Sequence, residues 1–388
     1  SNRGGGLEVV RALVEVGVDV CEKTEKFASA IIVAAETGNV EIIRFLLAQN
    51  KSLVDYEGYD EGRTPLLMAA QNGRTDAVQC LLEHDADPTK MRKKMCAMHV
   101  AAQYGHAEVL KVLLETSKVV VGVDADLPHS PDGKRNGSGG AVIYYLSPLM
   151  LAARYGHVEA TKVLLEAGAE VNKGDTTGWN SLHRAASAGH IKVIELLLSH
   201  DADMTKKNTS GLTPLAAAAK SGQANAVQLL MAKGANMGDI NDDGQTPLLI
   251  ACSNGHEAVV RTLSPSAGES PPYVRAERTN SLGVKDDKMR TPLIAAAEAG
   301  SLGSVRHLVS LKQWAKVGGG APSDDDDEEI VGALKEARTG GHVAVASLLL
   351  RKLSSRKRQS RSNTLSIYAC HQQTYYAQQR RELWLETV

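Results

Sequence analysis

Large aromatic side chains are scarce in this chain of 388 residues. Aromatic residues make up 4% of the sequence, with two Phe in all, although apolar residues as a whole reach 43%. A single globular core of this size usually depends on large aromatic side chains. Ala, Leu and Val must therefore fill the interior, which suits short helices that pack closely together.

Other features that the sequence lacks restrict the functions that the chain can have. The five cysteines are odd in number, scattered and without a CxxC pair, which argues against a disulfide framework or a zinc site and for a reducing compartment. The sequence has no secretory signal and no apolar run long enough to span a bilayer. The net charge of −1 gives no overall preference for nucleic acid or for an anionic membrane.

Charge is nevertheless distributed unevenly. Residues 351–388 hold eight Lys and Arg against two Asp and Glu, whereas the rest of the chain holds 36 against 43. The sequence therefore predicts an acidic body followed by a basic tail. Nucleic-acid binding through residues 351–361 is one hypothesis that this tail raises, but the acidic body argues against it.

One ten-residue segment recurs along the chain. The steps from the copy at 147 to those at 180, 213 and 246 are each 33 residues, and the other steps are of 32, 35 or more than 40. A degenerate copy, GALKEARTGG, lies at 332–341, and residues 5–20 match only the back half of a repeat. The full copies occupy residues 29–38, 64–73, 96–105, 147–156, 180–189, 213–222, 246–255 and 291–300.

Each copy reads as a helix followed by a turn. In TPLLMAAQNG (64–73), Thr64 suits an N-cap and Pro65 the first helical turn. Leu and paired Ala follow at helical spacing, and Gly73 suits a left-handed helix end. A second helix then closes on a Leu pair. Such helices are too short to persist alone in water, so each must be covered by the next repeat.

This pattern resembles the ankyrin repeat family, in its period, its TPLHxAA-like segment, its turn glycine and its Leu pair. The resemblance implies an all-α solenoid of helix–turn–helix repeats joined by β-turn loops. We predict that residues 5–350 form this array, with an N-terminal half-repeat and about nine repeats. Insertions are expected at 119–145, 264–288 and 316–328, and residues 351–388 are expected to form a disordered tail.

Two departures from the pattern predict local irregularity. The glycine that normally precedes the repeat is missing before the copies at 29, 96, 147 and 291, so these turns are expected to be irregular. In the copy at 246, Ser264 and Pro265 replace the end of the Leu pair and are expected to end the second helix early.

No catalytic motif is found, and we predict neither an enzyme nor a cofactor or metal site. Most of the twelve histidines occupy fixed repeat positions, such as the residue after the turn glycine. By the resemblance, such histidines bond to neighbouring backbone and connect repeats. The acidic run Asp324–Glu329 offers a loose cation site at most, and a solvated loop that also suits the N-terminus of the following helix is the simpler interpretation.

By the resemblance, partners bind the concave face made by the turn tips and the first helices. The two residues before each turn glycine are exposed there. Tyr, Trp and Arg dominate binding hot spots, and we predict that they anchor a protein partner, with two polar residues at the rim. The alternative is that the aromatics only pack against the 119–145 loop or an adjacent turn. The predicted residues are Tyr104, Tyr155, Trp179 and Arg154, with Gln103 and Lys220 at the rim.

The tail carries weaker signals. Basic residues precede Ser354, Ser360 and Thr364, as at sites of basophilic kinases, and the run 351–361 resembles a nuclear import signal. A solvated basic tail is the simpler interpretation. The C-terminal Val388 suits a PDZ-type groove only poorly, because Glu386 stands where Ser or Thr is usual.

Two functions remain open. The first is a cytoplasmic scaffold or signalling adaptor that binds a protein on the concave face, with entry into the nucleus through the basic run as a further option. The second is a regulatory or targeting fragment of a larger protein such as a kinase, a channel or a ubiquitin-ligase substrate adaptor. The start at Ser1 in the middle of a repeat favours a fragment.

Overall fold

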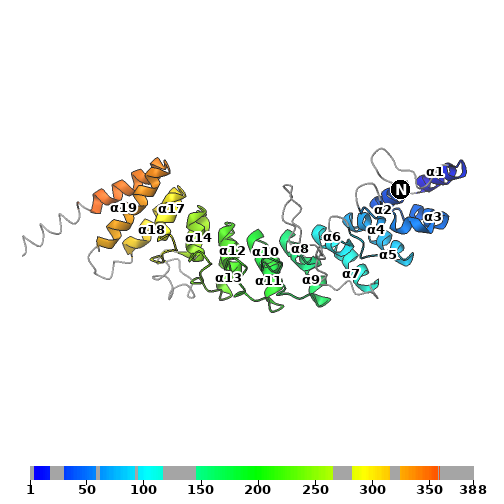
Figure 1. Ribbon diagram of the computed structural model, residues 1–388, viewed down its shortest axis with the longest axis horizontal. Coiled ribbons are helices and arrows are strands. Elements are labelled where there is room, and N and C mark those ends of the chain that lie inside the picture. The colour runs from blue at the N-terminus through cyan, green and yellow to red at the C-terminus, as the bar shows by residue number, and fades with distance from the viewer. Residues whose placement is uncertain are drawn as a thin grey trace, which may run out of the picture. The chain divides into compact units, whose positions relative to one another are not determined.

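The computed structural model describes residues 4–17, 30–57, 62–91, 95–116, 146–264, 282–314, 324–356 and 358, and all of the regular elements there are helices apart from one isolated bridge residue. The chain divides into two compact units, Ser1–Asn236 and Met237–Val388. The predicted all-α repeat solenoid is confirmed within each unit, where successive helix pairs stack side by side (Figure 1).

The first unit contains one row of first helices and one row of second helices. Each helix contacts its partner in the same repeat and its counterpart in the next repeat. The first row comprises α2 (Ala30–Thr37), α4 (Pro65–Gln71), α6 (Ala97–Tyr104), α8 (Pro148–Tyr155), α10 (Ser181–Ala188) and α12 (Pro214–Lys220). The second row comprises α3 (Val40–Gln49), α5 (Thr75–Glu83), α7 (Ala107–Thr116), α9 (Val158–Glu166), α11 (Ile191–Leu198) and α13 (Ala224–Ala232).

Two further helices complete the first unit. The N-terminal α1 (Gly4–Glu15) contacts α3, which places the predicted half-repeat in the second row. The short 3-10 helix η1 (Lys51–Asp55) follows α3 and contacts α4.

The second unit repeats the arrangement. First helices α14 (Pro247–Ser253), α17 (Pro292–Glu298) and α19 (Asp324–Thr339) contact one another in sequence. Second helices α15 (Glu257–Leu263) and α18 (Leu302–Trp314) lie beside each other, and a last helical run covers 343–356. As predicted, α15 ends early, at Leu263.

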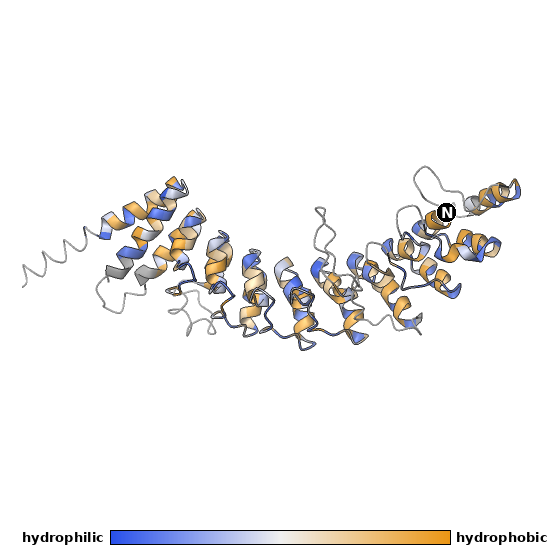
Figure 2. Ribbon diagram, in the orientation of Figure 1, coloured by the Kyte–Doolittle hydropathy of each residue, from blue (hydrophilic) through white to orange (hydrophobic). Residues whose placement is uncertain are grey.

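The core follows from the repeated residues. Leu66, Ala69 and Ala70 of α4 are almost fully buried, and their counterparts in the other first helices are buried in the same way. The small Ala side chains let neighbouring helices approach closely. Figure 2 shows apolar and polar residues alternating along each helix, as expected where one face is covered by the next repeat.

The first helices begin and end as the sequence predicts. The hydroxyl oxygens of Thr64, Ser147, Thr213 and Thr246 each accept a hydrogen bond from the backbone N–H three residues on, at 3.3 Å. The turn glycines have positive φ, between 65° and 81° from Gly38 to Gly341. Both caps satisfy backbone groups that a short helix otherwise leaves unpaired.

The turns between repeats are fixed by one Asp or Asn side chain each. Asn208 Oδ1 accepts from the backbone N–H groups of Ser210 and Leu212, and Asp175, Asn241 and Asp286 make the same pair of bonds at their turns. Adjacent turns are joined by the backbone bond from Thr209 N to Thr177 O, at 2.9 Å.

Some of the predicted boundaries differ from the structure. The turn before the copy at 291 is regular, contrary to expectation, because Met289 adopts the left-handed conformation (φ 60°) that a glycine takes at the other turns. The insertion predicted at 264–288 overlaps this turn. Helix α19 starts at Asp324, inside the insertion predicted at 316–328, and the last helix continues to Arg356, inside the predicted tail. Residues 119–145 lie outside the described residues.

Candidate functional site

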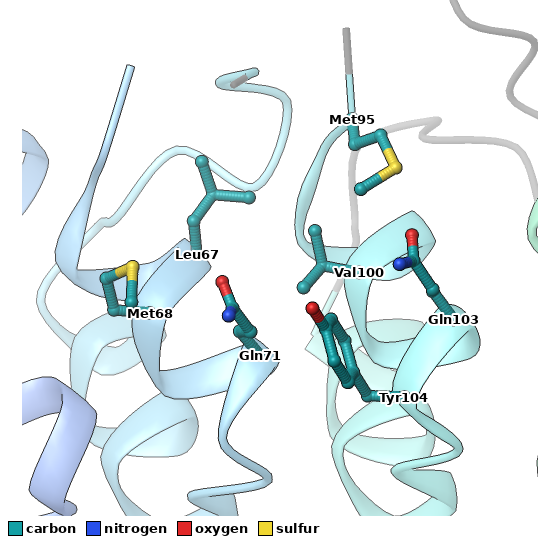
Figure 3. A pocket seen from close by; sticks show the side chains of 7 residues that line it. All are labelled: Leu67, Met68, Gln71, Met95, Val100, Gln103 and Tyr104. Atoms are coloured by element: carbon teal, nitrogen blue, oxygen red, sulfur yellow. The ribbon is translucent and has the colours of Figure 1, made fainter. Parts of the chain in front are cut away.

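A groove opens between α4 and α6 in the first unit. Its volume is about 290 Å³, and Leu67, Met68 and Val100 form an apolar floor of which little is exposed. In Figure 3, Gln71 of α4 and Tyr104 of α6 face each other across the gap. Gln103 and Met95 complete the rim. Two residues predicted from the sequence, Gln103 and Tyr104, therefore border a pocket.

Histidines of successive repeats hold the backbone at the borders of the groove. His106 Nε2 donates to the carbonyl oxygen of Gln71 at 3.0 Å, and His157 Nε2 donates to that of Gln103 at 2.9 Å. His190 makes the same bond to Arg154, at 3.0 Å. Each bond connects one repeat to the preceding one, which confirms the expectation for these histidines.

The same histidines support the exposed tyrosines. The Tyr104 ring stacks on His106 and the Tyr155 ring on His157, each with centroids 6.4 Å apart. The two rings remain 47% and 46% exposed. Two large aromatic side chains are thus held at equivalent helix ends in adjacent repeats, with nearly half of their surface available for contact.

Arg154 lies beside Tyr155 and is exposed. Its guanidinium carbon is 5.8 Å from the centroid of the Tyr155 ring, and it forms no ion pair with any described carboxylate. Lys220, at the end of α12, occupies the position equivalent to Arg154 two repeats further on, and it is also exposed. Both therefore lie along the same row of helix ends.

Trp179 does not join the tyrosines. It precedes the N-cap Asn180 of α10, so it lies at the turn end of the first-helix row, whereas Tyr104 and Tyr155 lie at the opposite end. An eight-residue helix separates the two ends by about 12 Å. The single patch of three aromatics that the sequence predicted is therefore not formed.

The surroundings of Trp179 indicate a structural role. Its ring lies 5.7 Å from that of His183 and 4.9 Å from the guanidinium carbon of Arg184, and Arg184 pairs with the buried Asp175. The Trp179 backbone N–H donates to the same Asp175. Trp179 thus packs against residues of its own repeat.

The chemical groups in this region suit binding. Burial raises the pKa of the Cys96 thiol, which lies 3.0 Å from His99 Nδ1, so the thiol stays protonated and is a poor nucleophile. Burial also lowers the pKa of His183, whose Nε2 bonds to the carbonyl oxygen of Leu212. Among the described residues, no three His, Cys, Asp or Glu side chains are arranged to hold a metal ion.

The tail residues are only partly described. Ser354 is exposed within the last helix, and its hydroxyl donates to the carbonyl oxygen of Leu350 at 2.9 Å. Ser360, Thr364 and Val388 lie outside the described residues. In the described part of the chain, no helix has the length and apolar character needed to cross a membrane.

The sequence missed the floor of the groove. Leu67, Met68 and Val100 of the floor and Met95 of the rim read as ordinary helix or turn residues, because a gap between two helices depends on how neighbouring side chains pack. The repeat position was the one available signal, since it places Leu67, Met68 and Val100 on first helices.

Comparisons with known proteins agree with the repeat architecture. A family model described as ankyrin repeats (3 copies) matches residues 1–92, 51–127, 129–208 and 202–273. The human "Transient receptor potential cation channel subfamily A member 1" is 28% identical over 153 residues, which cover 39% of this chain and 12% of the relative. The "Probable E3 ubiquitin-protein ligase XBOS32" of Oryza sativa subsp. japonica is 31% identical over 192 residues, which cover 44% and 37%.

A shorter match adds to the pattern. The human "Ankyrin repeat and SOCS box protein 3" is 31% identical over 102 residues, which cover 25% of this chain and 19% of that protein. The chain thus spans well under half the length of these three relatives. The repeated helix pairs, the capping threonines, the histidine bonds between repeats and the family match over most of residues 1–273 lead to one conclusion: the chain belongs to the ankyrin repeat family.

Proposed function

We propose that this chain is a scaffold that binds a partner protein along its row of first helices. Ankyrin repeats are generally protein-interaction modules. The observation that carries the proposal is the α4/α6 groove, which Tyr104 borders, together with the exposed Tyr155 at the equivalent helix end of the next repeat. An apolar pocket rimmed by polar groups, with half-exposed aromatics beside it, has the composition of a binding hot spot.

The anchoring residues of this scaffold are Gln103, Tyr104, Arg154 and Tyr155, with Lys220 as a distant contact. The histidine bonds hold the backbone carbonyls of Gln103 and Arg154, so little order has to be created there on binding. Trp179 contributes by holding the turn of its own repeat. The basic run 351–361 and the serines within it are proposed as a regulated second contact.

Affinity capture with quantitative mass spectrometry tests the proposal. The double substitution Tyr104→Ala and Tyr155→Ala is expected to reduce recovery of bound proteins at least tenfold, since hot-spot truncations typically cost more than about 1.4 kcal/mol. Gln79→Ala with Lys162→Ala serves as the matched control, because both residues are exposed on second helices. Equal recovery with the two variants, at unchanged thermal stability, contradicts the proposal.

A second candidate is that the array is the targeting part of a larger multidomain protein. The observation in its favour is that the similar proteins include a cation channel, a ubiquitin-protein ligase and a SOCS box protein, each much longer than the match. Transcript sequence upstream of Ser1 distinguishes this candidate from a free-standing scaffold, because it shows whether another domain is joined to the array.

We further propose that the chain acts in the cytoplasm, reaches the nucleus through residues 351–361, and has no catalytic activity of its own. Imaging of the tagged chain with the basic residues of 351–361 replaced by Ala tests whether this run directs the chain to the nucleus. Retained nuclear entry would exclude this run as the signal.

A further inference from the structure

The two helix rows of the first unit differ in charge. From α2 to α12, the first helices carry one carboxylate, Glu36 of α2, against three cations, Arg154, Arg184 and Lys220. From α5 to α13, the second helices carry three lysines against seven carboxylates. Those carboxylates are Asp76, Glu83, Glu108, Glu115, Glu159, Glu166 and Glu195.

The turns beside the first helices do not cancel this difference. Between α11 and α12, Asp201 and Asp203 are balanced by Lys206 and Lys207. Between α9 and α10, Glu170 and Lys173 offset each other, and the buried Asp175 is occupied by Arg184. Because Arg184 is paired with Asp175, Arg154 and Lys220 give the row from α4 to α12 its positive charge beside an acidic second row, although the net charge of the chain is −1.

The groove places a second, independent requirement on the partner. A space of about 290 Å³ exceeds the roughly 150 Å³ that holds a benzene molecule in an apolar cavity, so it accepts a large aliphatic or aromatic side chain. Gln71 and Gln103 at the rim can each donate to and accept from a peptide main chain. A nucleic acid backbone has no apolar side chain for this floor, which favours a polypeptide over another polyanion.

From these two observations we propose that the partner is an extended acidic protein segment with one large apolar residue. This inference rests on the proposed function and names the partner's chemistry. The apolar side chain fills the α4/α6 groove, and carboxylates of the same segment pair with Arg154 on α8 and with Lys220 on α12. Arg184 stays paired with Asp175 and is not part of this contact.

The repeat geometry sets the spacing of the segment. Neighbouring helices lie about 8–10 Å apart, so α8 is about 12–15 Å from the centre of the groove and α12 about 28–35 Å. An extended chain advances about 3.3 Å per residue. The first carboxylate therefore belongs about four residues from the apolar anchor, and the second about nine or ten.

A displayed library of random 16-residue peptides, selected on the intact chain, tests the inference. The enriched peptides are expected to be net negative, with an aromatic or large aliphatic residue and Asp or Glu at these two spacings. Enrichment of neutral or basic peptides contradicts the inference. So does tighter binding of a single-stranded 20-nucleotide DNA than of the best peptide, since that would assign the cationic row to nucleic acid.

Charge reversal then locates the binding. Arg154→Glu with Lys220→Glu is expected to weaken the best peptide at least tenfold in fluorescence anisotropy, and the loss should shrink as salt is raised. Lys162→Glu with Lys192→Glu makes the same charge change on the second row and is expected to alter affinity less than twofold. Equal losses in both variants overturn the inference.

Two outcomes distinguish a wrong partner class from a wrong scaffold proposal. If tyrosine substitution abolishes capture but the enriched peptides are not acidic, the partner class is wrong and the scaffold proposal stands. If neither tyrosine substitution nor charge reversal affects capture, both are wrong.

Discussion

The N-cap residue before each first helix shows how one side-chain atom affects local stability. Helix α6 begins after Cys96, which makes no side-chain capping bond, whereas the equivalent Ser147 of α8 accepts one from Met150 N. Ser and Thr caps typically contribute about 1 kcal/mol over residues that cannot accept. The repeat containing α6 is therefore less stable at its start than its neighbours.

We predict that Cys96→Thr raises the free energy of unfolding by about 1 kcal/mol, because the hydroxyl can accept from the N–H of His99. Urea denaturation followed by circular dichroism measures the change. The reverse substitution Ser147→Cys is the control and is expected to lower stability by a similar amount. A fall in stability for Cys96→Thr would show that the Cys96–His99 contact matters more than the cap.

A second residue-scale prediction concerns Met289. Its φ of 60° is unfavourable for a side chain, and its own side chain is 66% exposed, so little packing is lost on its removal. Met289→Gly is expected to stabilise the second unit by about 0.5–1 kcal/mol. Thermal denaturation detects this as a higher midpoint.

The matched control for Met289 is Gly244→Ala at the equivalent turn position. It should destabilise, because a Cβ there lies 2.6 Å from Asp287 Oδ1 and φ is 71°. If Met289→Gly gave no gain while Gly244→Ala gave its loss, the strain assigned to Met289 would be wrong.

At this scale the sequence predicts repeated roles better than unique ones. The turn glycines and the histidines after them recur at fixed positions, and the structure confirms both. Trp179 occurs once, and nothing in its position distinguishes a ring that faces a partner from one that packs under Arg184. The groove floor was not foreseen because it depends on two adjacent repeats together.

At the scale of elements, the contact between the end of one first helix and the next repeat should contribute most to stability. Gly105 ends α6 with φ 76°, and a Cβ added there lies 2.5 Å from His157 Nδ1. Gly105→Ala is therefore expected to combine backbone strain with displacement of the histidine that bonds to Gln103. We predict that Gly105→Ala lowers the free energy of unfolding by more than about 2 kcal/mol, since backbone strain alone costs about 1–2 kcal/mol.

Gly168→Ala provides the comparison for Gly105→Ala. Gly168 has an even larger φ, 85°, but no described atom lies within 4 Å of an added Cβ. The decrease in the free energy of unfolding for Gly168→Ala should stay near the cost of backbone strain alone, about 1–2 kcal/mol. Equal losses in urea denaturation would show that the histidine bond between repeats contributes little.

Polar contacts of α19 explain why the last helix extends into the predicted tail. Arg356 pairs with Asp327 at 2.9 Å, and the Thr291 hydroxyl donates to Glu329, so the acidic start of α19 contacts both neighbours. Burial and the nearby Arg356 also lower the pKa of Lys352. These pairings could not be predicted from the sequence, because the acidic run 324–329 and the residues 351–356 lack an apolar period and lie far apart in the chain.

We predict that Asp327→Asn loosens the end of the last helix. Amide hydrogen exchange in residues 350–356 should speed up several-fold, since a partly exposed ion pair contributes up to about 1 kcal/mol. Asp287→Asn, in the same unit, is the control and should leave exchange there unchanged. Unaltered exchange in the Asp327 variant would mean that the pair does not hold the helix.

At the scale of the whole molecule, stability is a sum over neighbouring repeats. The long step between the copies at 96 and 147 does not interrupt the stack, because α6 and α8 remain in contact and His157 reaches Gln103 across it. The repeat pattern predicts this continuity, because insertions between repeats leave the helix faces unchanged. What the pattern cannot predict is the partner, since recognition uses the residues that vary between repeats.

The central claim is that the first-helix row, and not the second, recognises a protein. Site-specific photo-crosslinking tests it most directly, with benzoylphenylalanine placed either at Gln103 beside the groove or at the exposed Gln79 on α5. We predict a crosslinked partner band from position 103 that the acidic library peptide displaces, and none from position 79. A partner crosslinked from position 79 alone, or equally from both positions, would contradict the account.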